Sequence, residues 1–84
     1  MPRFRKKAVE IEACQFTGDN FKEILSFIGN KEIAYREGNF IIIKTLEGDH
    51  RAIPYDWIIR GVKGEFYPCK PDIFAETYEQ ISNI

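Results

Sequence analysis

The residues best suited to catalysis in this sequence are one histidine, His50, and two carboxylates, Asp56 and Glu65. Nucleophilic catalysis needs a nucleophile, a base and a group that orients the base. His50 directly follows the turn-forming run 47–49 without such partners, so we interpret it as an exposed turn residue. Asp56 and Glu65 could share acid and base roles across a hairpin, but Asp56 also suits a turn after Pro54. We therefore predict no catalytic residue, and a carboxylate-dependent hydrolase is the least favoured function.

Ligand binding is indicated more strongly, by the aromatic, charged and turn-forming residues of segment 54–74. A ring such as Tyr55 or Trp57 near Arg60 and Lys63 suits a base stacked on the ring with its phosphate on the cations. The alternative is that Trp57 lies under a C-terminal helix, since tryptophan is highly buried on average. The predicted ligand-binding residues are Gln15, Tyr55, Asp56, Trp57, Arg60, Lys63, Glu65 and Tyr67.

Other motifs narrow the possible functions. The loop Gly61-Val62-Lys63-Gly64 matches the Gly-x-x-Gly clamp of one class of RNA-binding domain, but that clamp joins two helices. Here the flanking residues have strand character, which favours a tight hairpin turn. Two cysteines, Cys14 and Cys69, and one histidine cannot supply the four ligands of a zinc site within one chain. We therefore expect no metal, no cofactor and no nucleic-acid polymer as a partner.

The composition indicates one folded domain, residues 1–84, with 44% hydrophobic and 30% charged residues. A chain this short buries only roughly 60–65% of its unfolded surface, so a homo-oligomer would add stability. The longest apolar run, residues 40–43, is too short to cross a membrane. Glu10 and Glu12 interrupt the segment after the basic start, so we expect no signal peptide and a reducing cytoplasm.

Charge is unevenly distributed although the net charge is only −1. The start of the chain is basic and its last twenty residues are acidic. The residues concerned are Arg3, Arg5, Lys6 and Lys7 at the start, and Glu65, Asp72, Glu76 and Glu79, set against Lys70, near the end. Such blocks are usually solvated faces. The alternative is head-to-tail attraction between subunits, which high salt would weaken.

The first elements must position these residues. Residues 8–16 alternate between apolar and acidic side chains, which predicts a half-buried strand. A helix is predicted from residue 21, with Asn20 as its cap and Glu23 as the capping-box partner. Its apolar face comprises Phe21, Ile24, Leu25 and Ile28. Gly29 suits the left-handed position that ends a helix.

The remaining sequence predicts a meander followed by a second helix. The predicted strands are residues 33–36, 40–46, 50–53, 57–60 and 65–67. Pro68 is expected to end the sheet and Pro71 to open the helix at its first position. The inner face of that helix is predicted to be Ile73, Phe74, Thr77, Tyr78 and Ile81. The predicted class is α+β: a small antiparallel sheet of five to six short strands, with one helix early and one at the C-terminus.

Residues 58–78 resemble the C-terminal signature of a family of small, largely uncharacterised bacteriophage and prophage proteins, the Pro-Gly-Asp-Tyr-Gly (PGDYG-like) type. Residues 12–18 and 45–48 look like that family's earlier segments, so the resemblance spans nearly the whole chain. One departure is Tyr55, which stands where the family usually has glycine after the proline. A bulky residue disfavours a turn that needs a positive φ, so we expect the local backbone or pocket to differ.

The resemblance implies a phage accessory protein that acts in the cytoplasm of the bacterial host, and it brings no catalytic residues. Small phage proteins of this kind often blunt host defence. The leading hypothesis is therefore a non-catalytic, oligomeric binding module that sequesters a small nucleotide-like ligand. The main alternative is a protein–protein inhibitor of a host complex, and a structural phage component is a further one.

Overall fold

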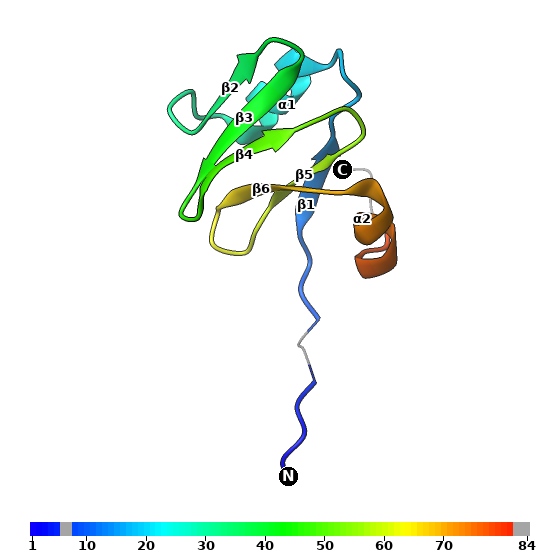
Figure 1. Ribbon diagram of the computed structural model, residues 1–84. Helices are drawn as coiled ribbons and strands as arrows, with labels where there is room; N and C mark the ends of the chain where they lie inside the picture. The colour runs from blue at the N-terminus through cyan, green and yellow to red at the C-terminus, as the bar shows by residue number, and fades with distance from the viewer. Residues whose placement is uncertain (6–7, 82–84) are drawn as a thin grey trace.

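The computed structural model describes residues 1–5 and 8–81, which form two three-stranded antiparallel sheets and two short helices (Figure 1). In chain order the elements are β1 (Glu12–Gln15), α1 (Phe21–Ile28), β2 (Ala34–Glu37), β3 (Phe40–Thr45), β4 (Gly48–Ala52), β5 (Trp57–Arg60), β6 (Phe66–Cys69) and α2 (Pro71–Thr77). One sheet has the order β1-β5-β6 and the other β2-β3-β4. This confirms the predicted α+β class. The division of the strands into two sheets was not predicted.

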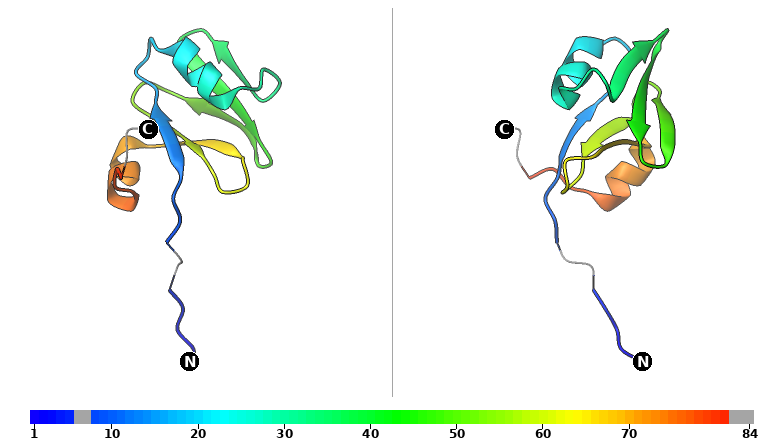
Figure 2. Two further views of the ribbon diagram at one scale, coloured as in Figure 1. Left: turned by 180° about the vertical axis from the view of Figure 1, so that it is seen from behind. Right: turned by 90° about the vertical axis from the view of Figure 1, so that its left-hand side faces the viewer.

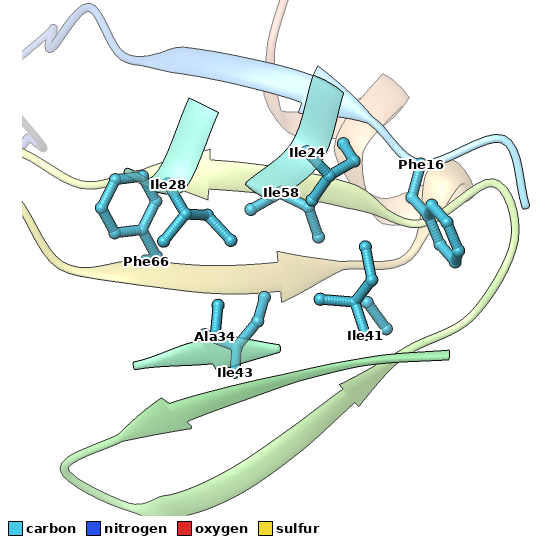
Figure 3. Packing of buried hydrophobic residues seen from close by; sticks show 9 residues of the cluster. Phe16, Ile24, Ile28, Ala34, Ile41, Ile43, Ile58 and Phe66 are labelled. Carbon is cyan, nitrogen blue, oxygen red and sulfur yellow. The ribbon is translucent and has the colours of Figure 1, made fainter. Parts of the chain in front are cut away.

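The hydrophobic core lies where α1 and the inner faces of both sheets meet (Figure 3). Ile24 comes from α1, Ile58 from β5 and Ile41 and Ile43 from β3, and all four are fully buried. Ile42 points to the other face of its sheet, as strand alternation requires, and is still only 7% exposed. The isoleucine run of β3 is therefore buried on both faces, as predicted.

Helix α1 forms where the sequence predicts it, but its first turn is organised differently. Gly29 has φ 70° and ends the helix in the left-handed conformation. The Asn20 side chain does not cap the helix; its Oδ1 accepts from the backbone N–H of Thr17 instead, at 2.8 Å. Its amide nitrogen donates to the Gln15 carbonyl and to the Glu23 carboxylate. The predicted capping box is therefore wrong, because Asn20 ties the helix to the end of β1.

Three strand predictions also need correction. Strand β1 begins at Glu12 rather than at residue 8. Pro68 does not end the sheet: it lies within β6 opposite Ile58, which is possible because β6 pairs only with β5 and has an outer edge. His50 is not an exposed turn residue, because β4 starts at Gly48 and holds it half-buried opposite Ile43.

Helix α2 begins at Pro71, as predicted, and packs on the side of the β1-β5-β6 sheet that faces away from the core (Figures 1 and 2). Its Phe74 ring stacks on Trp57, with ring centroids 4.3 Å apart and planes 6° from parallel. Tyr78 contacts Phe74 in turn, at 5.1 Å. The prediction that Ile73, Thr77 and Ile81 belong to this inner face is wrong, since Thr77 is exposed and Ile73 and Ile81 are 53% and 65% exposed.

Residues 1–5 and 8–11 belong to no helix or strand and lead away from the folded part of the chain (Figures 1 and 2). We call residues 1–5 the arm. Lys6 and Lys7, part of the predicted basic start, lie outside the described residues. Over the described ranges, no helix has both the length and the apolar character needed to span a bilayer.

The stacking of Phe74 on Trp57 should fix α2, because a seven-residue helix is unstable without packing. We expect Phe74→Ala to lower the free energy of unfolding by about 2 kcal/mol. It should also shift the fluorescence of Trp57, the only tryptophan, to longer wavelength. Ile73→Ala on the exposed side of α2 is the control. Equal effects of the two substitutions would contradict the packing role of Phe74.

Candidate functional site

The most unusual backbone in the structure is the turn that connects β4 to β5. Its third residue, Tyr55, has φ 77° and is the only non-glycine with a positive φ among the described residues. The Asp56 N–H donates to the Ile53 carbonyl at 3.1 Å and closes a four-residue turn. Proline second and a positive φ third are typical of a type II turn, in which the third residue is normally glycine. A side chain in this conformation costs roughly 1–2 kcal/mol.

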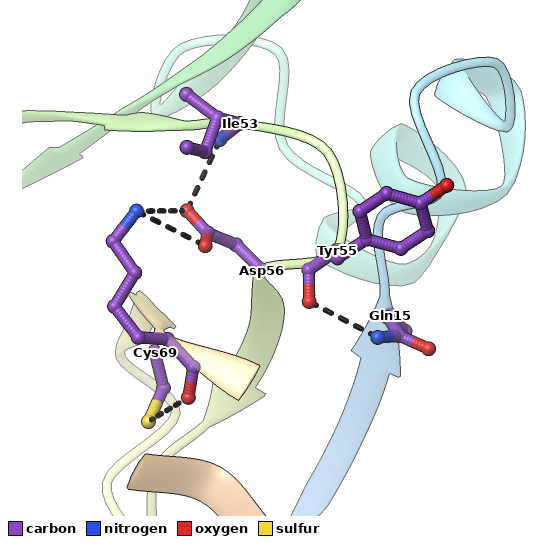
Figure 4. Close-up of polar contacts among 6 residues, drawn as sticks. Gln15, Ile53, Tyr55, Asp56 and Cys69 are labelled. Atoms are coloured by element: carbon purple, nitrogen blue, oxygen red, sulfur yellow. Dashed lines mark hydrogen bonds and ion pairs between the residues drawn. The ribbon is translucent and has the colours of Figure 1, made fainter. Parts of the chain in front are cut away.

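Several hydrogen bonds hold this turn against the end of β1 (Figure 4). The Tyr55 N–H donates to the Phe16 carbonyl, and the Phe16 N–H donates to the Asp56 carbonyl at 2.9 Å. The Gln15 side-chain amide donates to the Tyr55 carbonyl at 3.0 Å. Gly18 approaches Pro54 so closely that an added Cβ would lie 3.1 Å from its Cγ. The backbone is therefore fixed, while Tyr55 is 62% exposed.

Asp56 holds the same turn from inside the protein. Its side chain is 2% exposed, and Oδ2 accepts from the Ile53 N–H at 3.1 Å. Lys70 Nζ lies 3.1 Å from Oδ1 and 3.2 Å from Oδ2 (Figure 4). Lys70 directly precedes α2, so this ion pair joins the turn to the start of that helix. The Asp56 carboxylate is thus occupied by internal partners and hidden from a ligand.

Three other predicted residues share the sheet face that α2 covers. Gln15 and Trp57 are direct cross-strand partners, and Tyr67 lies opposite Ile59 on the next strand. Burial, followed by the hydrogen-bonding influence of the Tyr78 hydroxyl, raises the pKa of Tyr67 to about 12. Trp57 and Tyr67 therefore pack against α2, as the alternative interpretation of Trp57 proposed.

Arg60, Lys63 and Glu65 lie at the other end of the β5–β6 hairpin. Arg60 is on the opposite sheet face from Trp57, where it donates to the Glu12 carboxylate at 2.7 Å and to the Phe27 carbonyl at 3.1 Å. The Glu65 carboxylate accepts from the backbone N–H of Lys63 at 3.1 Å. Residues 61–64 form the tight turn that the two glycines predict. These side chains mainly hold the hairpin together.

An open hollow lies beside Arg60, between the start of β1 and the hairpin loop. Its walls are formed by Glu10, Ile11, Glu12, Ala13, Phe27, Arg60, Gly61, Val62, Gly64, Gln80 and Ile81. Isoleucine and valine side chains make part of the wall apolar, and Glu10 and Glu12 add carboxylates. This is a second location, separate from the turn at Tyr55.

The structure thus divides the predicted site into two groups. Gln15, Tyr55, Asp56 and Trp57 lie where β1 ends and β5 begins. Arg60 lies three residues, or roughly 10 Å, further along the hairpin, and Lys63 and Glu65 lie about five residues, or roughly 17 Å, from the first group. Tyr67 lies between the two groups, opposite Ile59. Asp56 and Glu65 consequently cannot act as a carboxylate pair. Asn20 and Lys70, which organise the first group, were not recognised from the sequence. The one sequence feature that indicated an organising role was the position of Asn20 at the end of the turn-forming run 17–20.

The Asp56–Lys70 pair predicts a non-additive effect on stability. Asp56→Ala leaves the Ile53 N–H unpaired, and Lys70→Met leaves a buried carboxylate without its cation, so each should cost about 2–3 kcal/mol. The double substitution should cost little more than Asp56→Ala alone, as urea unfolding would measure. Lys63→Met, at an exposed loop position, is the control. Additive losses would show that the pair is not coupled.

The raised pKa of Tyr67 predicts a loss of stability at high pH. The folded state keeps its proton up to about pH 12, while the unfolded state loses it near pH 10, so stability falls between these values. Because Tyr67 is partly exposed, we expect a loss of only about 1 kcal/mol. Tyr67→Phe should remove this part of the alkaline destabilisation, measured by urea unfolding at pH 9 and at several higher pH values. An unchanged pH profile in Tyr67→Phe would contradict the assignment.

Comparisons of the chain with known protein families, with curated proteins and with solved structures found no match. The function proposed below therefore depends on the geometry of this chain and on the resemblance described from its sequence.

Proposed function

We propose that this protein is a non-catalytic binding module that recognises another protein, with Tyr55 as the central contact residue. The observation that carries the proposal is the combination of a left-handed backbone with an exposed ring at Tyr55. Tyrosine is among the residues that most often dominate the binding energy of protein interfaces. A rigid, exposed tyrosine on a protruding turn suits insertion into a pocket of a partner.

Tyr55 is 62% exposed, so little of its side chain packs against its own chain to offset the strain. Glycine would adopt the same φ without the steric cost, and the ring has no aromatic partner among the described residues. Strained conformations of this kind persist only where the surrounding structure imposes them, and they cluster at binding and catalytic sites. A contact with a partner molecule would give tyrosine an advantage over glycine at this position.

The nucleotide-sequestering role predicted from the sequence receives less support from the geometry. It requires rings and cations around one ligand, but Trp57 is covered by Phe74 and Arg60 is on the other sheet face. The hollow beside Arg60 includes neither Tyr55 nor Trp57 in its walls. Protein recognition needs no concave site on this chain, so it fits better.

The resemblance to small phage proteins supplies the setting of the proposal. The partner would be a protein of the bacterial host, met in the host cytoplasm. The protein would then be a phage accessory factor, acting against host defence by occluding a surface of a host complex. These elements rest on the resemblance, whereas the contact at Tyr55 rests on the geometry.

Tyr55→Gly tests the proposal because it removes the ring and relieves the turn. We expect unchanged stability, or a gain of up to about 1 kcal/mol, since relief of the left-handed strain exceeds the entropy cost of glycine. Binding to a host protein captured by the wild type should weaken at least about 30-fold, measured by calorimetry with the purified partner.

Tyr35→Thr is the matched control, because Tyr35 is also an exposed tyrosine but lies on β2 with ordinary strand geometry. It should leave binding unchanged. Equal binding by Tyr55→Gly and the wild type would refute the contact role of Tyr55. Thermal stabilisation of the wild type by a nucleotide, unaffected by Tyr55→Gly, would favour the ligand hypothesis instead.

A further inference from the structure

We propose that the arm of one copy of the chain binds in the hollow beside β1 of a second copy, and that the exchange is reciprocal. The product is a two-fold dimer in which the arm of each copy runs antiparallel to β1 of the other. This inference is independent of the partner proposed for Tyr55, because it concerns the purified chain alone.

The first observation is the open edge of β1. This strand pairs with β5 on one side only, and within the described residues no strand pairs with its other edge. Such an edge presents backbone N–H and C=O groups that another extended segment can pair with. Residues 10–13, which run into and along β1, also form one wall of the hollow.

The second observation is that the arm contains apolar surface that its own chain does not cover. Phe4 is 92% exposed, and Val9, just beyond the arm, is 49% exposed. Figures 1 and 2 show the arm leading away from both sheets. No glycine, proline or asparagine occurs between Arg5 and Glu12 to favour a tight reversal onto the chain's own hollow. In the proposed dimer, the arm that enters the hollow belongs to a second, antiparallel copy, so neither chain has to reverse its direction.

The third observation is the match between the arm and the hollow in polarity and charge. Ile11, Val62 and Ile81 give the hollow an apolar wall suited to the Phe4 ring. Glu10 also lines the hollow, and its carboxylate has no ion pair in the described chain closer than 4.0 Å. Arg3 and Arg5 flank Phe4 and supply the opposite charge. The second carboxylate, that of Glu12, is already paired with Arg60.

These contacts predict how the dimer responds to substitution. Sedimentation of the full chain should show a monomer–dimer equilibrium that shifts toward monomer as salt rises. Phe4→Ser should raise the dimer dissociation constant at least about tenfold. Leu46→Ser, which removes a fully exposed leucine from the β3–β4 turn, should leave it unchanged.

A charge exchange separates this arrangement from other dimers. Arg5→Glu and Glu10→Lys should each weaken association, and the double variant should recover at least part of the loss, because opposite charges again face each other across the interface. A wild-type chain that stays monomeric at millimolar concentration would overturn the proposal. A dimer that is indifferent to Phe4→Ser, or one in which the double variant shows no recovery, would overturn it too.

Discussion

The burial of the Asp56 carboxylate is the constraint on which the rest of the structure depends. A charge taken out of water is costly unless it is paired and hydrogen-bonded. Among the described residues the Asp56 carboxylate is bound by Lys70 and by the backbone N–H of Ile53, which come from opposite sides of β5 in the sequence. Ile53 follows the last strand of one sheet, while Asp56 precedes the central strand of the other. Satisfying this one group therefore joins the two sheets and the start of α2.

The same constraint explains how a tyrosine can occupy a position suited to glycine. The turn is closed at Asp56, tied to β1 through Phe16 and Gln15, and pressed against Gly18. Tyr55 therefore keeps its positive φ, because breaking several hydrogen bonds would cost more than the strain.

Much of the fold could be predicted from local patterns, whereas the site could not. The spacing of Ile24 and Ile28, the glycine after α1 and the proline at the start of α2 each act within a few residues, and each prediction is confirmed. The strand alternation also shows, without any structure, that Trp57 and Arg60 point to opposite faces. The pairing of Asp56 with Lys70 is long-range and carries no periodic signal. For this reason Lys70 was missed, although Asp56 was recognised as a residue suited to the turn.

The two surfaces proposed for recognition lie at opposite ends of β1, and this separation has a consequence for function. Gln15, at one end, contacts the Tyr55 turn, and Glu12, at the other, borders the hollow. A dimer formed through the hollow would leave both Tyr55 rings exposed. Two linked copies of one contact residue bind a repeated or symmetric partner with an avidity of about 10²–10⁴ over the single contact, provided that both can engage at once. Dimerisation would in this way compensate for the small contact surface of an 84-residue chain.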